Sequence, residues 1–335
     1  MAILNLGTVI AVAKETAIGV PVTSWSDNMV VSFNDGSSIT PSSEVLSRTL
    51  LNGSYISCPS LSGTQSASGN LDTEIGIQAK SGTEAGKLKA HLIWEACLGT
   101  YVKQGADCSV PNTIGIEADP IANPTGYDLY KLSKPDEPSI TLAVREYLGG
   151  TNKVLETRGV VVTSLAISLA SGQLATASAS VDGVDYAMPN VGGTILNNLG
   201  CGANPFVVKL AKFIYKGVSV DAQDVTITIN NEVTDRSYIQ GNGISAKVIV
   251  AKSVEVSYNI DLVNLSAYDD LKNNTKGALY VELVNGSEEM KIYIPEMSYT
   301  AVDKSVDGGI LTLGITGQAT ESASLPEAIL IATKK

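Results

Sequence analysis

Histidine, the side chain most often used as a general acid or base in enzymes, is scarce in this sequence. His91 is the single histidine, so a Ser-His-Asp triad or a histidine metal site has one donor at most. It lies beside Leu88 and Leu92, in a segment whose apolar residues recur at helical spacing. We therefore expect His91 to lie on a helix face, in a packing or surface role. We predict that the protein is not an enzyme and that it needs no metal and no other cofactor.

Three glycine-containing stretches resemble ligand-binding motifs, and each lacks a required part. Gly82–Leu88 is one residue too short between its glycines for a phosphate loop, and it ends in Leu where Ser or Thr must bind magnesium. Gly241–Ala246 has dinucleotide-loop spacing, but a strand-like segment follows it instead of a helix. Asp303–Gly309 begins like a calcium loop but has Gly314 at the position of the bidentate Glu. We interpret the last two as turns.

The cysteines show no metal or redox spacing. Cys58, Cys97, Cys108 and Cys201 are far apart, with no Cys-x-x-Cys pair. Buried or idle thiols are the first interpretation. A disulfide between Cys97 and Cys108, across the end of the expected helix, is the alternative for a particle that leaves the cell, and sequence alone does not decide the connectivity.

Composition favours a mainly β fold. The chain has 335 residues, 44% hydrophobic and only 17% charged, with 31 glycines, which suits short strands joined by turns. The formal net charge of −11 argues against a basic groove that holds nucleic acid. The sequence has neither a long uncharged apolar span nor a basic signal-peptide region at its start. We expect a protein that is made in a cytoplasm and does not enter a membrane.

The clearest signal is an alternation of apolar and polar residues, which occurs twice. The stretch NLDTEIGIQ (70–78) and the stretch VEVSYNIDL (254–262) each place apolar residues on one face. The other face of each is acidic and rich in amides, and it carries Asp72 and Glu74 in the first stretch and Glu255 and Asp261 in the second. Both stretches therefore predict strands with one buried face and one solvated face.

Each of these strands is followed by a predicted amphipathic helix. The first spans residues 84–98 with Leu88, Leu92 and Ala96 on one stripe, and Gly99 ends it. The second spans residues 265–274, with Ser266 as its N-cap and Leu265, Tyr268 and Leu271 packing inward. Strand-like segments follow both helices.

This order of elements indicates a tandem duplication. We predict a first unit over residues 1–182, with an exposed insertion at about 100–138, and a second unit over residues 183–335. Convergence of common β patterns is the competing explanation.

The ordered segments resemble a known family, the long, siphophage-like form of the phage tail tube protein. AVAKETAIGVPV is similar to its N-terminal arm, SRTLLNGSYISCPSLSG to an Arg-containing segment, and SASGNLDTEI to a strand before its helix. RGVVVTSLAISLASGQLATASASVDG resembles its hairpin, and KIYIPEMSYTAVDKSVDGGILTLGITGQA resembles its terminal strands. Residues 100–138 and 183–215 depart from the pattern.

The resemblance implies β-sandwich units, each with a flanking α-helix, whose inner strands form a ring-shaped β-barrel shared between subunits. Stacked rings would make a hollow tube in the virion tail, assembled in the host cytoplasm, through which viral DNA passes without specific binding. Asp72, Glu74, Glu255 and Asp261 would then face the lumen, although ordinary solvent-exposed positions explain them equally well. Three duplicated chains could build a pseudo-sixfold ring, with a hexamer as the alternative. Tail tip, tape-measure and terminator proteins would be its partners.

Two other classes compete with this interpretation. A secreted or surface carbohydrate-binding, adhesin-like β-sandwich would need a secretory route or an aromatic platform, and the chain has only two Trp. A glycosidase on a β scaffold would need two carboxylates at a fixed separation in a pocket, which sequence cannot reveal.

Overall fold

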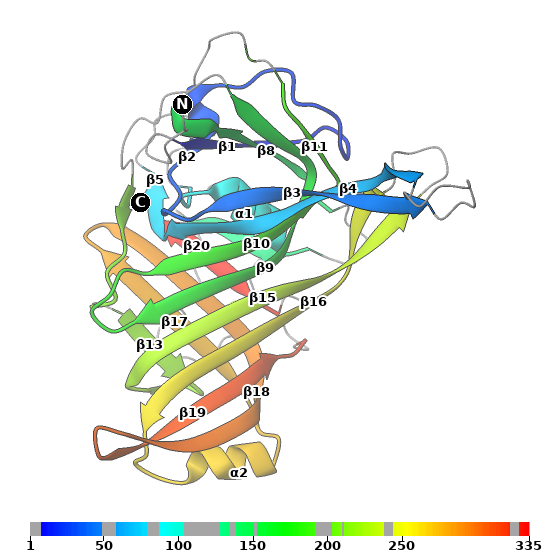
Figure 1. Cartoon of the computed structure of the whole chain (residues 1–335). Coiled ribbons are helices and arrows are strands. Elements are labelled where there is room, and N and C mark those ends of the chain that lie inside the picture. The colour runs from blue at the N-terminus through cyan, green and yellow to red at the C-terminus, as the bar shows by residue number, and fades with distance from the viewer. Residues whose placement is uncertain are drawn as a thin grey trace.

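The computed structural model of the chain is mainly β, as the composition predicts (Figure 1). It describes residues 8–48, 58–78, 87–103, 127–133, 139–150, 153–189, 191, 203–209, 211–237, 244–321 and 328–334. Within these residues, strand pairing connects 18 strands into one antiparallel sheet, and a separate sheet has two strands. The large sheet bends at two long strands, so that it forms three connected parts.

The main sheet has eight strands. In spatial order they are β3 (Ser38–Arg48), β4 (Cys58–Glu74), β10 (Thr176–Gly183), β9 (Val154–Ala170), β15 (Ala222–Ser237), β16 (Ile244–Asp261), β19 (Ile310–Ala319) and β18 (Glu288–Asp307). Only the second halves of β9 and β18 belong to this sheet. Their first halves continue into the other two parts.

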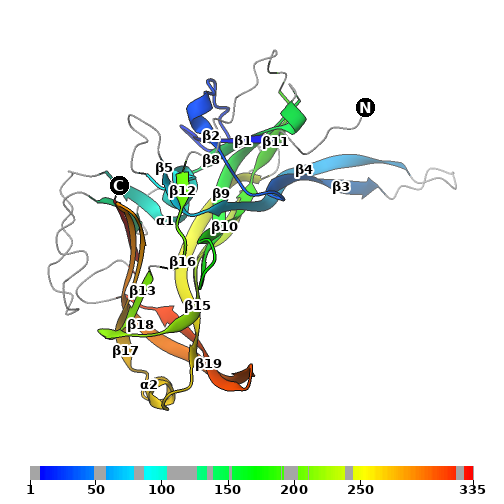
Figure 2. The same cartoon turned by 90° about the vertical axis from the view of Figure 1, so that its left-hand side faces the viewer.

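The upper sheet continues from the first half of β9. Its other strands are β2 (Val30–Val31), β1 (Val9–Lys14), β8 (Leu142–Tyr147) and β11 (Asp185–Ala187). The outer sheet continues from the first half of β18. Its other strands are β14 (Val218–Ser219), β13 (Ala211–Tyr215), β17 (Lys276–Asn285), β20 (Leu330–Lys334), β7 (Asp128–Leu132) and β6 (Gly99–Val102). Figure 2 shows the outer sheet facing the main sheet across a shared core.

The alternation that predicts the two strands also decides which face is buried. Val254, Val256 and Tyr258 are buried in β16, and Leu71 and Thr73 are buried in β4. The apolar residues on this face of the main sheet belong to one core cluster with residues of the outer sheet. The predicted buried faces are confirmed for these residues. The first stretch, however, divides at Ile75 into β4 and a separate strand, β5 (Gly76–Gln78), and Gly76 and Gln78, which were expected on the solvated face, are buried.

The first helix is shorter than predicted. α1 spans His91–Leu98, and residues 79–86 lie outside the described part of the chain. Leu88 is not helical because it forms a β-bridge with Ile77, and Ala90 takes a left-handed conformation (φ 57°) directly before the helix. Gly99 ends the helix with a left-handed conformation, as predicted (φ 102°). His91 packs, as expected, with its ring 5.1 Å from the ring of Tyr101.

The second helix, α2, spans Ser266–Lys272. The predicted cap is wrong, because the Asn264 side chain accepts the Ser266 N–H (3.0 Å) and Leu265 occupies the cap position. Leu265 was also expected to pack, but it is 63% exposed. Tyr268 and Leu271 do pack against the core.

The expected exposed insertion at about 100–138 is wrong at both ends. β6 and β7 pair with each other there, and β7 also pairs with β20. Leu129 and Tyr130 of β7 are fully buried as a result. Residues 104–126 and 134–138 lie outside the described residues.

The Asp303–Gly309 stretch forms a hairpin turn, as predicted. Gly308 and Gly309, at φ 54° and 88°, connect β18 to β19. For the Gly241–Ala246 stretch, residues 241–243 lie outside the described part, and β16 begins at Ile244.

A connecting segment, residues 203–208, covers the end of β4 and the start of β10. β12 (Ala203–Pro205) pairs with β5 (Gly76–Gln78) to form the two-stranded sheet. The next residue, Phe206, donates its N–H to the Ile75 carbonyl (2.8 Å) and accepts the Ala175 N–H (2.9 Å). Its side chain is fully buried in the core.

This burial makes Phe206 a major contributor to stability. Phe206→Ala should lower the free energy of unfolding of the unassembled chain by about 3–5 kcal/mol, because it leaves a cavity where a ring was packed. Val218→Ala is the control, because Val218 is 64% exposed. Urea denaturation followed by circular dichroism measures both, and equal small losses would contradict the packing described.

Candidate assembly interface

The structure brings the four predicted carboxylates to one face of the main sheet. Residues directly opposite each other in an antiparallel sheet point to the same side. One such row across six strands is Asp72, Ser178, Ala166, Thr228, Glu255 and Gln318. A second row is Glu74, Thr176, Ser168, Thr226, Ser257 and Thr316. Asp261 lies on this side of β16 too, because it alternates with Ser257. We call this side the polar face.

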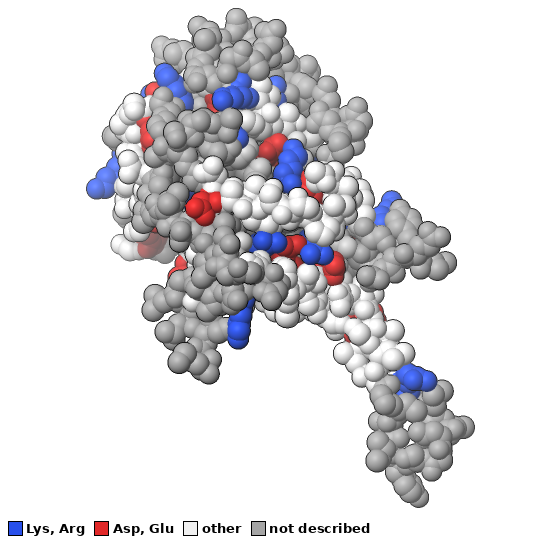
Figure 3. All heavy atoms as spheres, turned by 90° about the horizontal axis from the view of Figure 1, so that it is seen from above, with Lys and Arg blue, Asp and Glu red and all other residues white. Residues whose placement is uncertain are grey.

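The polar face is acidic and rich in hydroxyl groups. Asp72 accepts a hydrogen bond from the Ser178 hydroxyl, and Asp261 accepts one from the Gln223 amide (3.0 Å). Glu74 lies 3.7 Å from the Lys89 ammonium. The two rows contain neither Lys nor Arg. On the end of the molecule that Figure 3 shows, in contrast, basic and acidic side chains lie near one another.

The same strand order occurs twice within the main sheet. The order β3–β4–β10–β9 is followed by β15–β16–β19–β18. Beyond the main sheet, β9 continues to β8, β1 and β2, as β18 continues to β17, β13 and β14.

Irregularities in the pairing also recur at corresponding places. The extra residue of β9 opposite β10 is Thr163, and its hydroxyl donates to the Ser180 carbonyl (3.1 Å). The extra residue of β18 opposite β19 is Thr300, and its hydroxyl donates to the Thr316 carbonyl (3.2 Å). A second bulge interrupts both the β8–β9 and the β17–β18 pairings.

The two groups of four strands meet at the pairing of β9 with β15, which we call the internal joint. It runs from Ala170 opposite Asp224 to Ser164 opposite Asn230. Behind the joint, the Asn231 side chain donates to the Val162 carbonyl (2.8 Å) and the Cys97 carbonyl (3.1 Å). The joint is therefore continuous with the core under α1.

Two strand edges of the main sheet have no neighbouring strand in the described part of the chain. They are the side of β3 away from β4 and the side of the second half of β18 away from β19. The Ile39 N–H of β3 donates to Glu146 (2.8 Å), and Pro41 has no N–H to give. Burial raises the pKa of Glu146, and the Ile39 N–H opposes that rise. The Glu146 contact and the proline both limit uncontrolled pairing at this strand edge.

β3 and β4 also extend beyond the body as a hairpin arm, seen in Figures 2 and 3. Most residues of β3 beyond Pro41 are exposed. The arm carries three exposed apolar side chains, Val45 (68%), Leu46 (46%) and Leu61 (54%), and Leu46 is paired opposite Leu61. Exposed apolar side chains on a projecting arm are typical of a contact site for another molecule.

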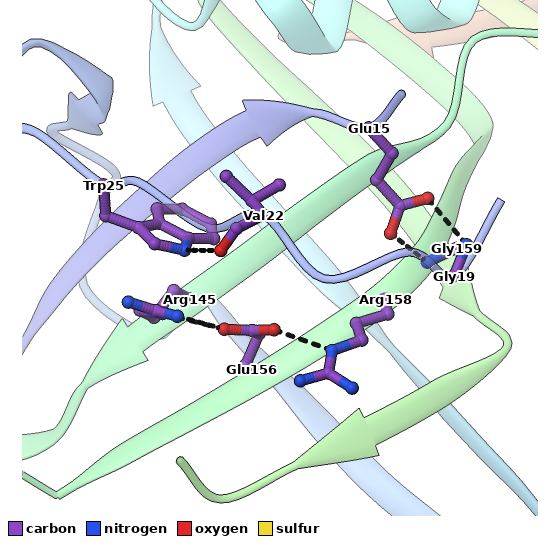
Figure 4. Close-up of polar contacts among 8 residues, drawn as sticks. All are labelled: Glu15, Gly19, Val22, Trp25, Arg145, Glu156, Arg158 and Gly159. Atoms are coloured by element: carbon purple, nitrogen blue, oxygen red, sulfur yellow. Dashed lines mark hydrogen bonds and ion pairs between the residues drawn. The ribbon is translucent and has the colours of Figure 1, made fainter. Parts of the chain in front are cut away.

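The segment between β1 and β2, part of the predicted N-terminal arm, is held against the upper sheet (Figure 4). Glu15 accepts the N–H groups of Gly19 (3.0 Å) and Gly159 (2.8 Å). The Trp25 ring packs against the Arg145 guanidinium, whose Cζ atom lies 4.4 Å from the centroid of the ring. This part of the arm is ordered by contacts within its own chain.

The charges beneath that segment form a buried network. Glu156 is 1% exposed and pairs with both Arg145 and Arg158, the latter at 2.7 Å (Figure 4). Two cations on one buried carboxylate satisfy both of its oxygens, and removal of the carboxylate would strand two guanidinium groups.

The cysteine pairing stays a prediction. Cys97 is a fully buried free thiol, and burial raises its pKa to about 12. Cys108 and Cys201 lie outside the described residues, and so does the side chain of Cys58.

Sequence reasoning missed the two open edges, the Glu146 contact and the arm. Strand edges depend on which strands pair, and no local pattern encodes that. Pro41 within a strand was the available signal, because proline is confined to strand edges and bulges.

A polar sheet face, two strand edges left open in the described residues and a projecting arm are features of a protein that assembles with other protein subunits. A family model described as phage tail tube protein matches residues 6–326. The chain belongs to that family and is a structural component of a phage tail. As a member of the family, it self-assembles into a tube and has other tail proteins as partners. No curated protein matches the chain. In the described part, none of the helices is long and apolar enough to cross a membrane.

The Glu15 contacts predict a pH effect on stability. Burial raises the pKa of Glu15 above its ordinary value of 4.5, against the opposing effect of its two backbone donors. The folded state therefore binds more protons than the unfolded state between the two pKa values, and stability falls as pH rises through that window.

Relative to Glu15→Gln, the wild-type chain should lose stability as pH rises from 4.5 and then level off. Urea denaturation at several pH values measures the difference, with Glu321→Gln as the exposed control. A difference that does not change with pH would contradict the assignment.

Proposed function

We propose that the chain is the major tail tube subunit, that three copies close into a pseudo-sixfold ring, and that stacked rings form the conduit for DNA ejection. The observation that supports this most directly is the internal joint. It joins two four-strand groups of equal order edge to edge, and the outermost strands of the main sheet, β3 and β18, keep open edges in the part of the chain that the structure describes. Repeating that joint between copies would continue the sheet until it closes.

A tandem duplication explains why the two groups match. Within the proposed units, residues 1–182 and 183–335, seven strands correspond in order: β1–β4 and β8–β10 of the first match β13–β19 of the second. A helix lies between the fourth and fifth of these strands in both units, and both bulges occupy matching positions. Common β patterns can converge on a strand order. A threonine hydroxyl that bonds across the same bulge in both units is a much more specific likeness.

The internal joint also predicts the register of the proposed pairing between β18 of one copy and β3 of the next, which we call the seam. Asp303 of β18 corresponds to Ala166 of β9, because each lies three residues after the extra threonine of its bulge, Thr300 or Thr163. Thr40 of β3 corresponds to Thr228 of β15, because Thr40 lies opposite Ser68 of β4 and Thr228 lies opposite Glu255, the counterpart of Ser68 in β16. Because Thr228 lies opposite Ala166, Thr40 of one copy should lie opposite Asp303 of the next.

The seam has fewer donors than the internal joint. Ile39 must exchange its Glu146 contact for a carbonyl of the neighbour, and Pro41 contributes only its carbonyl. We infer that isolated copies pair weakly and that closure of the full ring, with stacking, stabilises the seam. Ring closure then removes the open edges.

The polar face is the face available to the lumen. The opposite face of the main sheet is buried against the outer sheet and α1, so a barrel closed from these strands would point Asp72, Glu74, Glu255 and Asp261 inward. Carboxylates there repel DNA phosphates, and the genome can slide without binding.

The β3–β4 arm fits a contact with the adjacent ring. It projects from the body and carries the exposed apolar side chains of Val45, Leu46 and Leu61. Tail tip, terminator and tape-measure proteins would meet the ends and the lumen of such a tube, and assembly would take place in the host cytoplasm.

A cross-link tests the seam and its register. In assembled material, Thr40→Cys combined with Asp303→Cys should form disulfides between chains, seen on denaturing gels as dimers and closed trimers. Thr40→Cys with Ala301→Cys is the matched control, because it shifts the pair by one step along the same face and should cross-link much less. Equal cross-linking of both pairs, or of neither, would contradict the register, and species up to six chains would indicate a hexamer.

Charge reversal tests the lumen assignment. Glu255→Lys with Asp261→Lys should leave tubes assembled and should slow genome ejection, because lysines hold phosphates. Asp269→Lys with Glu321→Lys makes the same change in net charge at exposed positions outside the polar face. DNA release from phage particles measures both, and equal ejection rates would remove the lumen assignment.

A further inference from the structure

The second unit has an open apolar end that the first unit does not have. Around α2 and the β18–β19 turn, five large apolar side chains are exposed: Val263 (88%), Val306 (66%), Leu265 (63%), Ile310 (58%) and Leu311 (43%). This end lies at the bottom of Figure 1, away from β1. Such a concentration of exposed apolar residues marks a contact surface.

The corresponding end of the first unit is closed by the connecting segment of residues 203–208. The Ile75 N–H donates to the Ala175 carbonyl at 2.8 Å, and the Leu262 N–H donates to the Leu311 carbonyl at 2.8 Å, so these pairs correspond. In the first unit, Phe206 bonds to both Ile75 and Ala175, and Ala175 is fully buried. Leu311, its counterpart, is 43% exposed.

Behind the open end lies a cavity of about 610 Å³. Its inner wall is made by Tyr215, Tyr258 and Tyr299, whose counterparts in the first unit are Val12, Leu71 and Val162. The cavity is within the range of roughly 300–1,000 Å³ that is typical of ligand sites. The three tyrosines are larger than their counterparts in the first unit, yet the cavity is present. The reason is that no residue in the described part of the chain fills the position in the second unit that Phe206 fills in the first.

The repeat identifies the segment that fits this place. Val12 pairs with Val144 and Tyr215 with Leu279, each beside the same bulge, so β1 corresponds to β13. Ile3 precedes Val12 by the same number of residues as Phe206 precedes Tyr215.

Residues 1–7, which precede β1, are largely apolar (MAILNLG). They lie outside the described residues. β1 is at the opposite end of the molecule from α2 in Figures 1 and 2, so a neighbouring copy is the better source of the segment.

We propose that residues 1–7 of one copy cross the open end of the second unit of the next copy, with Ile3 in the cavity and backbone bonds to Leu262 and Leu311. This inference rests on the proposed ring, because it applies the relation between the two units of one chain to the units of neighbouring chains. It adds a second attachment to the seam, one that compensates for the missing donors of β3.

Photo-cross-linking from position 3 tests the attachment in the full chain. A benzoylphenylalanine in place of Ile3 should cross-link to peptides that contain Leu262–Leu265 or Val306–Leu311. In tubes assembled from isotope-labelled and unlabelled chains, mixed cross-links should show that the two peptides come from different chains. Cross-links within one chain, or to other peptides, would overturn the proposal.

Electron microscopy of the same sample separates this proposal from the ring itself. Rings without the expected cross-link would reject the attachment and leave the ring in place. Rings that never form, with the wild-type chain as the reference, would reject both.

Matched variants test the energetic contribution of the segment. Ile3→Asp should reduce the yield of rings at least tenfold, because it removes an apolar side chain from the wall of Tyr215, Tyr258 and Tyr299 and places a carboxylate in a cavity that Asp221 and Asp270 also line. Leu6→Lys is the control, since its counterpart in the connecting segment is the exposed Lys209, and Ile3→Phe should assemble normally because it copies Phe206. Equal losses for Ile3→Asp and Leu6→Lys, or none for either, would contradict the proposal.

Discussion

The pairing of backbone groups at strand edges is the constraint on which this structure depends. A sheet of this width ends in rows of N–H and C=O groups that must find partners or remain exposed. Within the chain, the edges of β9 and β15 pair with each other at the internal joint. At the outer ends, β3 and β18 keep their edges, and the Glu146 contact and Pro41 reduce what β3 offers to unselected strands. In the proposed ring, assembly would complete the pairing that folding leaves unfinished.

The two faces of the main sheet divide the remaining tasks. One face packs with the outer sheet and α1 into a single core, which holds the edges in a fixed curvature. The other face carries hydroxyl and carboxylate groups and neither Lys nor Arg in its two central rows. A rigid wall with an acidic surface suits a conduit for a polyanion, because like charges repel at short range. In the proposed tube, the same strands would provide both stability and the acidic lining of the channel.

Local sequence patterns predicted the parts of the structure that depend on near neighbours. The alternation in β4 and β16 correctly predicted the buried Leu71, Val254 and Val256 and the carboxylates on the opposite face. The start of α1 was wrong because Leu88 forms a bridge with Ile77, a tertiary contact that overrides helical spacing. β7 was missed for the same kind of reason, since it is a strand only through its pairing with β6 and β20. The open edges and the uncovered end near α2 follow from long-range pairing, which sequence periodicity does not record.

The symmetry of the assembled ring tests the central claim most directly. Electron microscopy of the purified protein, with rotational averaging of end-on views, measures it without any substitution. Three copies that repeat the internal joint should give a hollow ring with threefold symmetry and six similar lobes. A ring of six chains, with one unit of each at the lumen, or a protein that stays monomeric at concentrations that favour assembly, would contradict the account.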